Sequence, residues 1–225
     1  MARKTRGQSS KSAARSPDAA TAEDRIVDAF MRLLAARSPG RIGLAEIADE
    51  AGVSLGGLRE TLAGKLSMFA AFSRRIDRIV LDGGPGEGDT PRDRVFDVLM
   101  RRFDALAPYK EAIRSVARAA RRDLCLAAFL DRNATRSMNW MLVAAGADRP
   151  GMLGMVAVKG LVVVNADALR VWLDDDDPGL ARTMAALDRG LERGARAMDL
   201  ADRICGRLCA FAPRDRATRS RAAEA

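Results

Sequence analysis

The sequence contains no histidine, only three cysteines in 225 residues, and aromatic residues make up just 4% of it. Histidine is the side chain that most often acts as a general base or metal ligand near neutral pH, so we expect neither an enzyme nor a metal site. No P-loop or dinucleotide-binding glycine pattern is present, and we expect no cofactor. The cysteines, Cys125, Cys205 and Cys209, lack the spacing of a disulfide framework and are expected to be packing residues.

Long uninterrupted hydrophobic segments are also missing. The most apolar stretch, residues 152–172, is broken by Lys159, Asp167 and Arg170, which favours a buried helix over a membrane span. Residues 1–20 are basic and rich in serine and alanine, without the hydrophobic segment of a secretory signal. These absences indicate a cytoplasmic protein.

The net charge of +8 is concentrated at the two ends of the chain. Residues 1–20 carry five basic and one acidic residue, and residues 210–225 carry four and two. Both segments are poor in hydrophobic residues and are expected to be disordered tails. Such tails either bind nucleic acid without sequence preference or only keep the chain soluble.

Alanine, leucine and arginine dominate the composition, and they favour helices over strands. Apolar residues recur with the period of a helix, and no strand pattern or internal repeat is visible. The sequence therefore predicts an all-α protein. The first expected helix begins at Ala22 and ends before Ser38, the second covers residues 44–50, and the third is capped by Ser54 and ends before Gly64. Further helices are expected at 65–81, from Thr90-Pro91, from Pro108, and at 124–145, 152–173 and 180–198.

The glycine-rich segment 82–89 divides the chain into two expected domains. We place a small helical domain at residues 21–81 and a larger one at 90–209, with 82–89 as a flexible junction between them.

Residues 44–62 have the pattern of two helices joined by a sharp turn. Ala48 is small enough for the helices to cross closely, Gly52 can adopt the left-handed conformation of the turn, and Ser54 can cap the second helix. Leu58 and Leu62 then fix the angle between the helices. The second helix of such a unit can present its outer face to the major groove of DNA.

The segment 26–72, with Ile47-Ala48, Ala51-Gly52-Val53-Ser54, Leu58 and Lys65, resembles the DNA-binding domain of TetR-family transcriptional regulators. The motif covers about a fifth of the chain. The resemblance implies a TetR-like all-α fold, with an N-terminal three-helix helix-turn-helix domain and a larger C-terminal helical domain for ligand binding and dimerisation. It also implies a ligand-responsive repressor whose partners are double-stranded operator DNA, a small apolar effector or lipid, and a second copy of the chain.

Eight residues are candidates for DNA contact through this resemblance. Lys65 matches the lysine that meets a phosphate in the family, whereas Arg59 and Thr61 stand where the family usually has an aromatic residue and a histidine. Gly43 stands in place of a threonine that caps the second helix. The full set is Gly43, Ser54, Leu55, Gly57, Arg59, Glu60, Thr61 and Lys65.

The second domain is expected to hold an apolar effector pocket, because flexible methionines and rigid rings gather in its sequence. The helix that begins at Pro91 would couple this pocket to the first domain. Helices 152–173 and 180–198 carry more apolar surface than one small domain needs to bury, which predicts a homodimer through them. The predicted pocket residues are Phe96, Met100, Phe103, Phe129, Trp140, Met141 and Trp172.

A second resemblance competes with the first. The segment 140–198 resembles the C-terminal half of the TetR-fold lipid-binding accessory proteins of ubiquinone biosynthesis, which do not read DNA. Arg118, Arg121 and Arg122 form a basic cluster that is either a solvated helix face or a site for a partner or lipid headgroup.

Overall fold

Helices provide the regular secondary structure of residues 21–211, the part of the chain described by the computed structural model. The all-α prediction is confirmed for these residues. Of the predicted tails, residues 1–20 and 212–225 lie outside the described residues, and the side chains beyond Ile204 do so as well. The elements are α1 (Ala22–Ala36), η1 (Pro39–Arg41), α2 (Leu44–Ala51), α3 (Leu55–Thr61), α4 (Lys65–Asp82), α5 (Pro91–Leu106), η2 (Ala107–Tyr109), α6 (Lys110–Ala120), α7 (Leu124–Ala144), α8 (Gly151–Leu173) and α9 (Ala181–Phe211).

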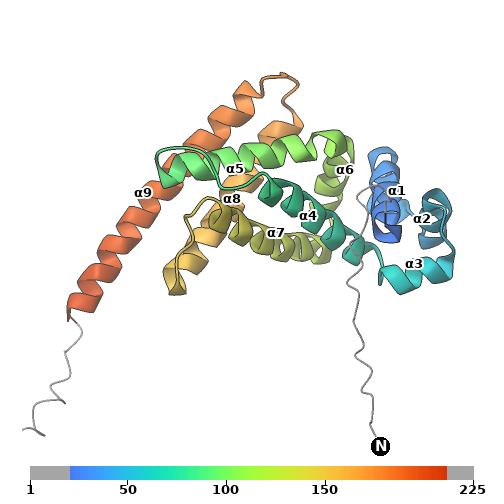
Figure 1. The fold of residues 1–225 in the computed structure, drawn as a ribbon, viewed down its shortest axis with the longest axis horizontal. Helices are drawn as coiled ribbons and strands as arrows, with labels where there is room; N and C mark the ends of the chain where they lie inside the picture. Colours follow the sequence, from blue (N-terminus) through green and yellow to red (C-terminus); the bar gives the residue numbers. More distant parts are fainter. Residues whose placement is uncertain (1–20, 212–225) are drawn as a thin grey trace, which may run out of the picture.

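The helices form a small group and a larger one (Figure 1). Helices α1, α2 and α3 gather at one end of the molecule, and α4 runs from them into the larger group of α5 to α9. The first helix begins at a capping box, in which the Thr21 hydroxyl accepts from the Asp24 amide and the Asp24 carboxylate accepts from the Thr21 amide. At the opposite end of the molecule, α9 extends beyond the other helices.

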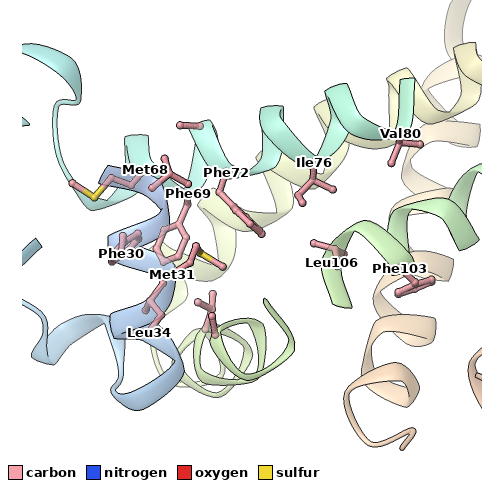
Figure 2. Close-up of a cluster of buried hydrophobic side chains, with 14 of the residues drawn as sticks. Phe30, Met31, Leu34, Met68, Phe69, Phe72, Ile76, Val80, Phe103 and Leu106 are labelled. Atoms are coloured by element: carbon pink, nitrogen blue, oxygen red, sulfur yellow. The ribbon is translucent and has the colours of Figure 1, made fainter. Parts of the chain in front are cut away.

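Helix α4 packs in both groups through one buried face. Near its start, Phe69 packs against Phe30 of α1, with 5.0 Å between the ring centroids. Further along, Val80 is buried where α4 reaches α5. Figure 2 shows this row of side chains passing from α1 at one end to Phe103 and Leu106 of α5 at the other. The helix therefore links the two groups, alongside the direct packing of α1 against α6.

The segment between α4 and α5 is fastened to the larger group, so the prediction of a flexible junction is wrong. The Gly86 amide donates to the Ala144 carbonyl at 3.0 Å. The Arg101 guanidinium donates to the carbonyls of Gly83 and Pro85 at 2.9 and 3.0 Å. A Cβ atom at Gly86 would lie 2.6 Å from a backbone oxygen of α5, which explains the glycine at this close approach. These contacts come from distant parts of the chain, which the local glycine content does not reveal.

Helix α9 is longer than predicted, because it continues past Met198 to Phe211. Its first turn is held by Asp175, whose buried carboxylate accepts from the Thr183 amide at 2.8 Å and the Thr183 hydroxyl at 2.7 Å. These hydrogen bonds, chiefly the one from the hydroxyl, hold the pKa of Asp175 below its ordinary value. The missing stop signal explains the error, since the sequence after Met198 contains no proline until residue 213.

Helix α8 is buried along one side only, which corrects the expectation of a buried helix. It packs against α7 and α9, but Met152, Met155 and Val163 on its outer side are 61–75% exposed. By length and composition alone α8 is apolar enough to cross a membrane, a test that core helices of soluble proteins also pass. The fold thus leaves an apolar stripe of α8 on the surface.

The structure describes the side chain of one of the three cysteines, Cys125. Cys125 is exposed at the start of α7, so the prediction that it packs in the core is wrong. Position 125 follows the first residue of its helix, where few neighbouring elements can cover a side chain. The side chains of Cys205 and Cys209 lie outside the described residues.

Candidate nucleic-acid interface

A tight turn joins α2 to α3. Gly52 has φ 64° and ψ 37°, the left-handed conformation that glycine adopts without steric cost. The Val53 amide then donates to the Ala48 carbonyl at 3.0 Å. The Ser54 hydroxyl accepts from the Gly57 amide at 3.0 Å and caps α3. The predicted structural roles of Gly52 and Ser54 in this turn are confirmed.

Helix α3 has one buried and one exposed side. Leu58 and Leu62 are 2% and 6% exposed and hold the helix against the small group. On the other side Leu55 is 54% exposed, and Arg59 and Glu60 are exposed as well. A short helix fixed on its inner side in this way can offer its outer side chains to a DNA groove.

Lys65, the first residue of α4, is tied to the segment in front of α2. Its ammonium group donates to the carbonyls of Pro39 and Ile42 at 2.8 and 3.2 Å. An ammonium group has three donors, so one remains for another acceptor. Lys65 therefore fixes the position of η1 and still carries its positive charge at this surface.

The acidic residues of α2 that face α1 are paired. Glu50 forms an ion pair with Arg32 at 2.9 Å, and Glu46 forms one with Arg37. The hydrogen bond from Arg37 holds the pKa of Glu46 below its ordinary value. These arginines neutralise carboxylates that would otherwise repel the phosphates of a nucleic acid.

Arg41 is a basic residue of this surface that the sequence analysis did not single out. It is exposed in η1, between the two carbonyls that Lys65 holds. Within residues 21–204, neither Arg41 nor Arg59 forms an ion pair. Its place in the sequence could have indicated that it belongs to this surface, because Arg41 stands two residues before Gly43, the N-cap of the first helix of the motif.

The eight residues predicted to contact DNA lie on neighbouring elements. Gly43 is the N-cap of α2 and makes no side-chain hydrogen bond there. The Thr61 hydroxyl donates to the Gly57 carbonyl at 2.7 Å, so it is engaged within α3. The structure places the others at the cap of α3, along α3 and at the start of α4, and their role in DNA contact stays a prediction: Ser54, Leu55, Gly57, Arg59, Glu60 and Lys65.

Comparisons with known proteins identify this arrangement of helices. No protein-family model and no curated protein matches the sequence. A TetR transcriptional regulator from Nitrosomonas europaea superimposes with a TM-score of 0.62 at 22% identity, over 78% of this chain and 98% of that one. A TetR-family regulator from Streptomyces coelicolor gives 0.56 at 20% identity, over 86% and 90%. One from Rhodococcus sp. RHA1 gives 0.55 at 22% identity, over 77% and 95%.

The chain has the TetR fold. This confirms the fold predicted from the motif around Gly52. The likeness extends over most of the chain and so includes the larger helical group, for which the sequence offered no diagnostic motif.

Within the TetR fold of this chain, an apolar cavity of about 390 Å³ lies where the start of α5, the end of α7, α8 and α9 meet. This volume falls within the range of small-molecule sites, about 300–1,000 Å³. Small residues provide the room, namely Ala157, Gly160 and Gly194. The walls include the larger apolar side chains of Val95, Leu142, Leu161 and Leu191.

None of the seven residues predicted to bind an effector lines this cavity. Phe103 and Trp172 are each 1% exposed and pack against one another, with 5.8 Å between their ring centroids. Met141 is fully buried, whereas Trp140 is 53% exposed. The larger side chains of the set thus fill the core or lie at the surface. The remaining three, Phe96, Met100 and Phe129, are partly buried.

Proposed function

We propose that the chain is a cytoplasmic, DNA-binding transcriptional regulator that acts as a repressor. The observation that carries the proposal is the α2–α3 unit. Leu58 braces α3 from inside and Ser54 caps it, while Arg59 lies on its outer side without an acidic partner in the described residues. An arginine presented in the major groove can donate two hydrogen bonds to guanine.

Arg41 and Lys65 are proposed to meet the phosphate backbone beside the groove. Both lie at the junction of η1, α2 and α4, and Lys65 keeps one free donor. Contacts of this kind fix the register of a protein on the duplex but do not distinguish sequences. In this proposal Arg59 reads the bases, whereas Arg41 and Lys65 position the protein on the phosphate backbone.

A homodimer through α8 and α9 is part of the proposal. The exposed apolar stripe of α8 is the kind of surface that a monomeric soluble protein rarely leaves uncovered. A two-fold dimer would place two copies of α3 on half-sites about 34 Å apart, or a multiple of that. Light scattering should give twice the mass of the chain, and a monomer at micromolar concentration would contradict this part of the proposal.

The effector is proposed to be a small apolar molecule bound in the cavity between α8, α9 and the start of α5. Pro91 at the start of α5 lines this cavity. The segment that joins the end of α4 to the start of α5 is fastened by Arg101. At its other end, α4 begins at Lys65. Occupancy of the cavity can therefore shift α4 and change operator affinity. A tenfold change requires about 1.4 kcal/mol of difference in ligand affinity between the two arrangements.

Selection of bound duplexes from a random DNA library tests the proposed function. Purified full-length protein should enrich an inverted repeat, because a symmetric dimer presents two identical reading helices. A library that shows no enriched sequence after repeated rounds, with a protein that is folded and dimeric, would contradict the proposal.

The alternative function is lipid binding without DNA reading, as in the accessory proteins of ubiquinone biosynthesis. Two observations favour it: Arg59 is the single basic residue of α3, and α8 exposes an apolar stripe. Mass spectrometry of extracted purified protein distinguishes the two functions. Copurified isoprenoid or phospholipid, together with no enriched DNA sequence, would support the alternative.

A further inference from the structure

A row of arginines on α6 and at its C-cap faces a cleft that the proposed function does not use. Arg114 and Arg118 of α6 and the C-cap residue Arg121 are spaced four and three residues apart, which places them on one side of the helix. All three line a cleft between α6, α7 and α8, and Arg170 of α8 lines the same cleft. The guanidinium groups of two helices thus border one space.

Two of these arginines have no acidic partner. Arg114 is engaged with Glu111 and with the Leu173 carbonyl, and Arg170 pairs with Asp167 at 2.5 Å. Within residues 21–204, Arg118 and Arg121 form no ion pair and are exposed. Like charges at this spacing repel one another along a helix, and an anion bound between them would remove the repulsion.

The cleft between the arginines also has an apolar part. Its lining includes Leu130 of α7 and Leu169 and Leu173 of α8, together with four alanines. Asp174 is the single acidic residue that lines it. The volume is about 800 Å³, near the upper end of the range for sites that take a whole small molecule. A purely ionic ligand would leave this apolar surface unused, and a purely apolar ligand would leave the guanidinium groups unpaired.

We propose that this cleft binds a single-chain anionic amphiphile, with its carboxylate or phosphate head between Arg118 and Arg121 and its hydrocarbon chain along the leucines. The planar guanidinium group can donate two parallel hydrogen bonds to either head group. The site lies apart from the cavity between α8 and α9, and the two share no lining residue. The proposal goes beyond the proposed function and holds whether or not the chain reads DNA.

Isothermal titration calorimetry of the full chain without DNA tests the site. The probes are dodecanoate and dodecyl phosphate below their micelle concentrations, with dodecanol and inorganic phosphate as the two halves of the ligand. At least one anionic amphiphile should bind, and each half should bind about tenfold more weakly or worse. Comparing dodecanoate with dodecyl phosphate identifies the preferred head group.

The variant R118Q/R121Q should weaken amphiphile binding about tenfold or more, since both head-group donors are lost. R132Q/R136Q is the matched control, because Arg132 and Arg136 of α7 are exposed, four residues apart, and form no ion pair in the described residues. Equal affinity of R118Q/R121Q and wild type, equal affinity for dodecanol and the anionic probes, or no binding of either amphiphile would overturn the proposal. If R118Q/R121Q instead lost affinity for a DNA duplex and no amphiphile bound, the arginines would be assigned to DNA.

Discussion

The guanidinium of Arg102 in α5 lies 2.5 Å from the carboxylate of Asp77 in α4, and both side chains are nearly buried. The same carboxylate oxygen accepts from the Ser137 hydroxyl of α7 at 2.5 Å. Helix α4 therefore meets two helices of the larger group, α5 and α7, at one charged cluster. Its position on α4 makes it a constraint on the helix that carries the small group.

The first prediction concerns this pair. D77A leaves the Arg102 charge buried without its partner and should lower the free energy of unfolding by about 3 kcal/mol. D77L/R102M removes both charges and should recover most of the loss, because an apolar pair of similar volume needs no compensation. Chemical denaturation measures both variants. A double variant as unstable as D77A would show that the ion pair is not the cause.

The second prediction separates two glycines of the helix-turn-helix. Gly52 adopts a left-handed conformation, so G52A should destabilise the protein by roughly 1–2 kcal/mol. Gly56 lies within α3, where a Cβ atom would make an ordinary contact with the Ser54 hydroxyl at 3.8 Å, so G56A should stabilise the protein by about 0.5–1 kcal/mol. Thermal unfolding of the two variants should therefore shift in opposite directions. A shift of the same sign in both would contradict the assigned conformations.

The outcome at these glycines shows what local sequence determines. The turn at Gly52 and the cap at Ser54 depend on a few neighbouring residues, and both were predicted correctly. The same holds for Thr90 and Pro91, where the Thr90 hydroxyl accepts from the Asp93 amide at 3.1 Å. Caps and turns of this kind can be recognised in the sequence because the backbone groups that they satisfy lie within one helical turn of the residue.

Features that depend on distant contacts were not predictable in the same way. The segment around Gly86 looks flexible in sequence but is held by Arg101 and the Ala144 carbonyl. The cavity has room because the side chains of Gly160 and Gly194 are single hydrogen atoms. No local sequence pattern shows that these two glycines, on α8 and α9, face the same space. Trp140 of α7 is predicted to line a pocket, yet its side chain is 53% exposed.

The third prediction concerns stability in acid. Hydrogen bonds from Thr183 lower the pKa of Asp175 in the folded state, so its contribution to stability is present above the unfolded value of 3.8. That contribution is lost as the pH falls through the lowered folded value. The free energy of unfolding should therefore fall less steeply below about pH 4 in D175N than in wild type. Identical pH profiles for the two proteins would contradict the role of Asp175 at the start of α9.

The fourth prediction concerns Lys65. K65M removes the anchor of η1 and one positive charge at the proposed interface. It should weaken binding to all duplexes alike and lower the slope of log affinity against log salt by about one unit. K65R keeps the charge and should preserve the slope. Fluorescence anisotropy over a series of salt concentrations measures both, and a wild-type slope in K65M would place Lys65 away from the phosphates.

The most direct test of the central claim is the affinity of R59A for the duplex selected by the wild-type protein. If the outer side of α3 reads DNA, anisotropy should show a loss of about 1–3 kcal/mol and weaker discrimination against a scrambled duplex. R132A is the matched control, an exposed arginine on α7, and it should bind both duplexes as wild type does. Equal affinity of R59A and wild type for the selected duplex would contradict the claim that α3 is the reading helix.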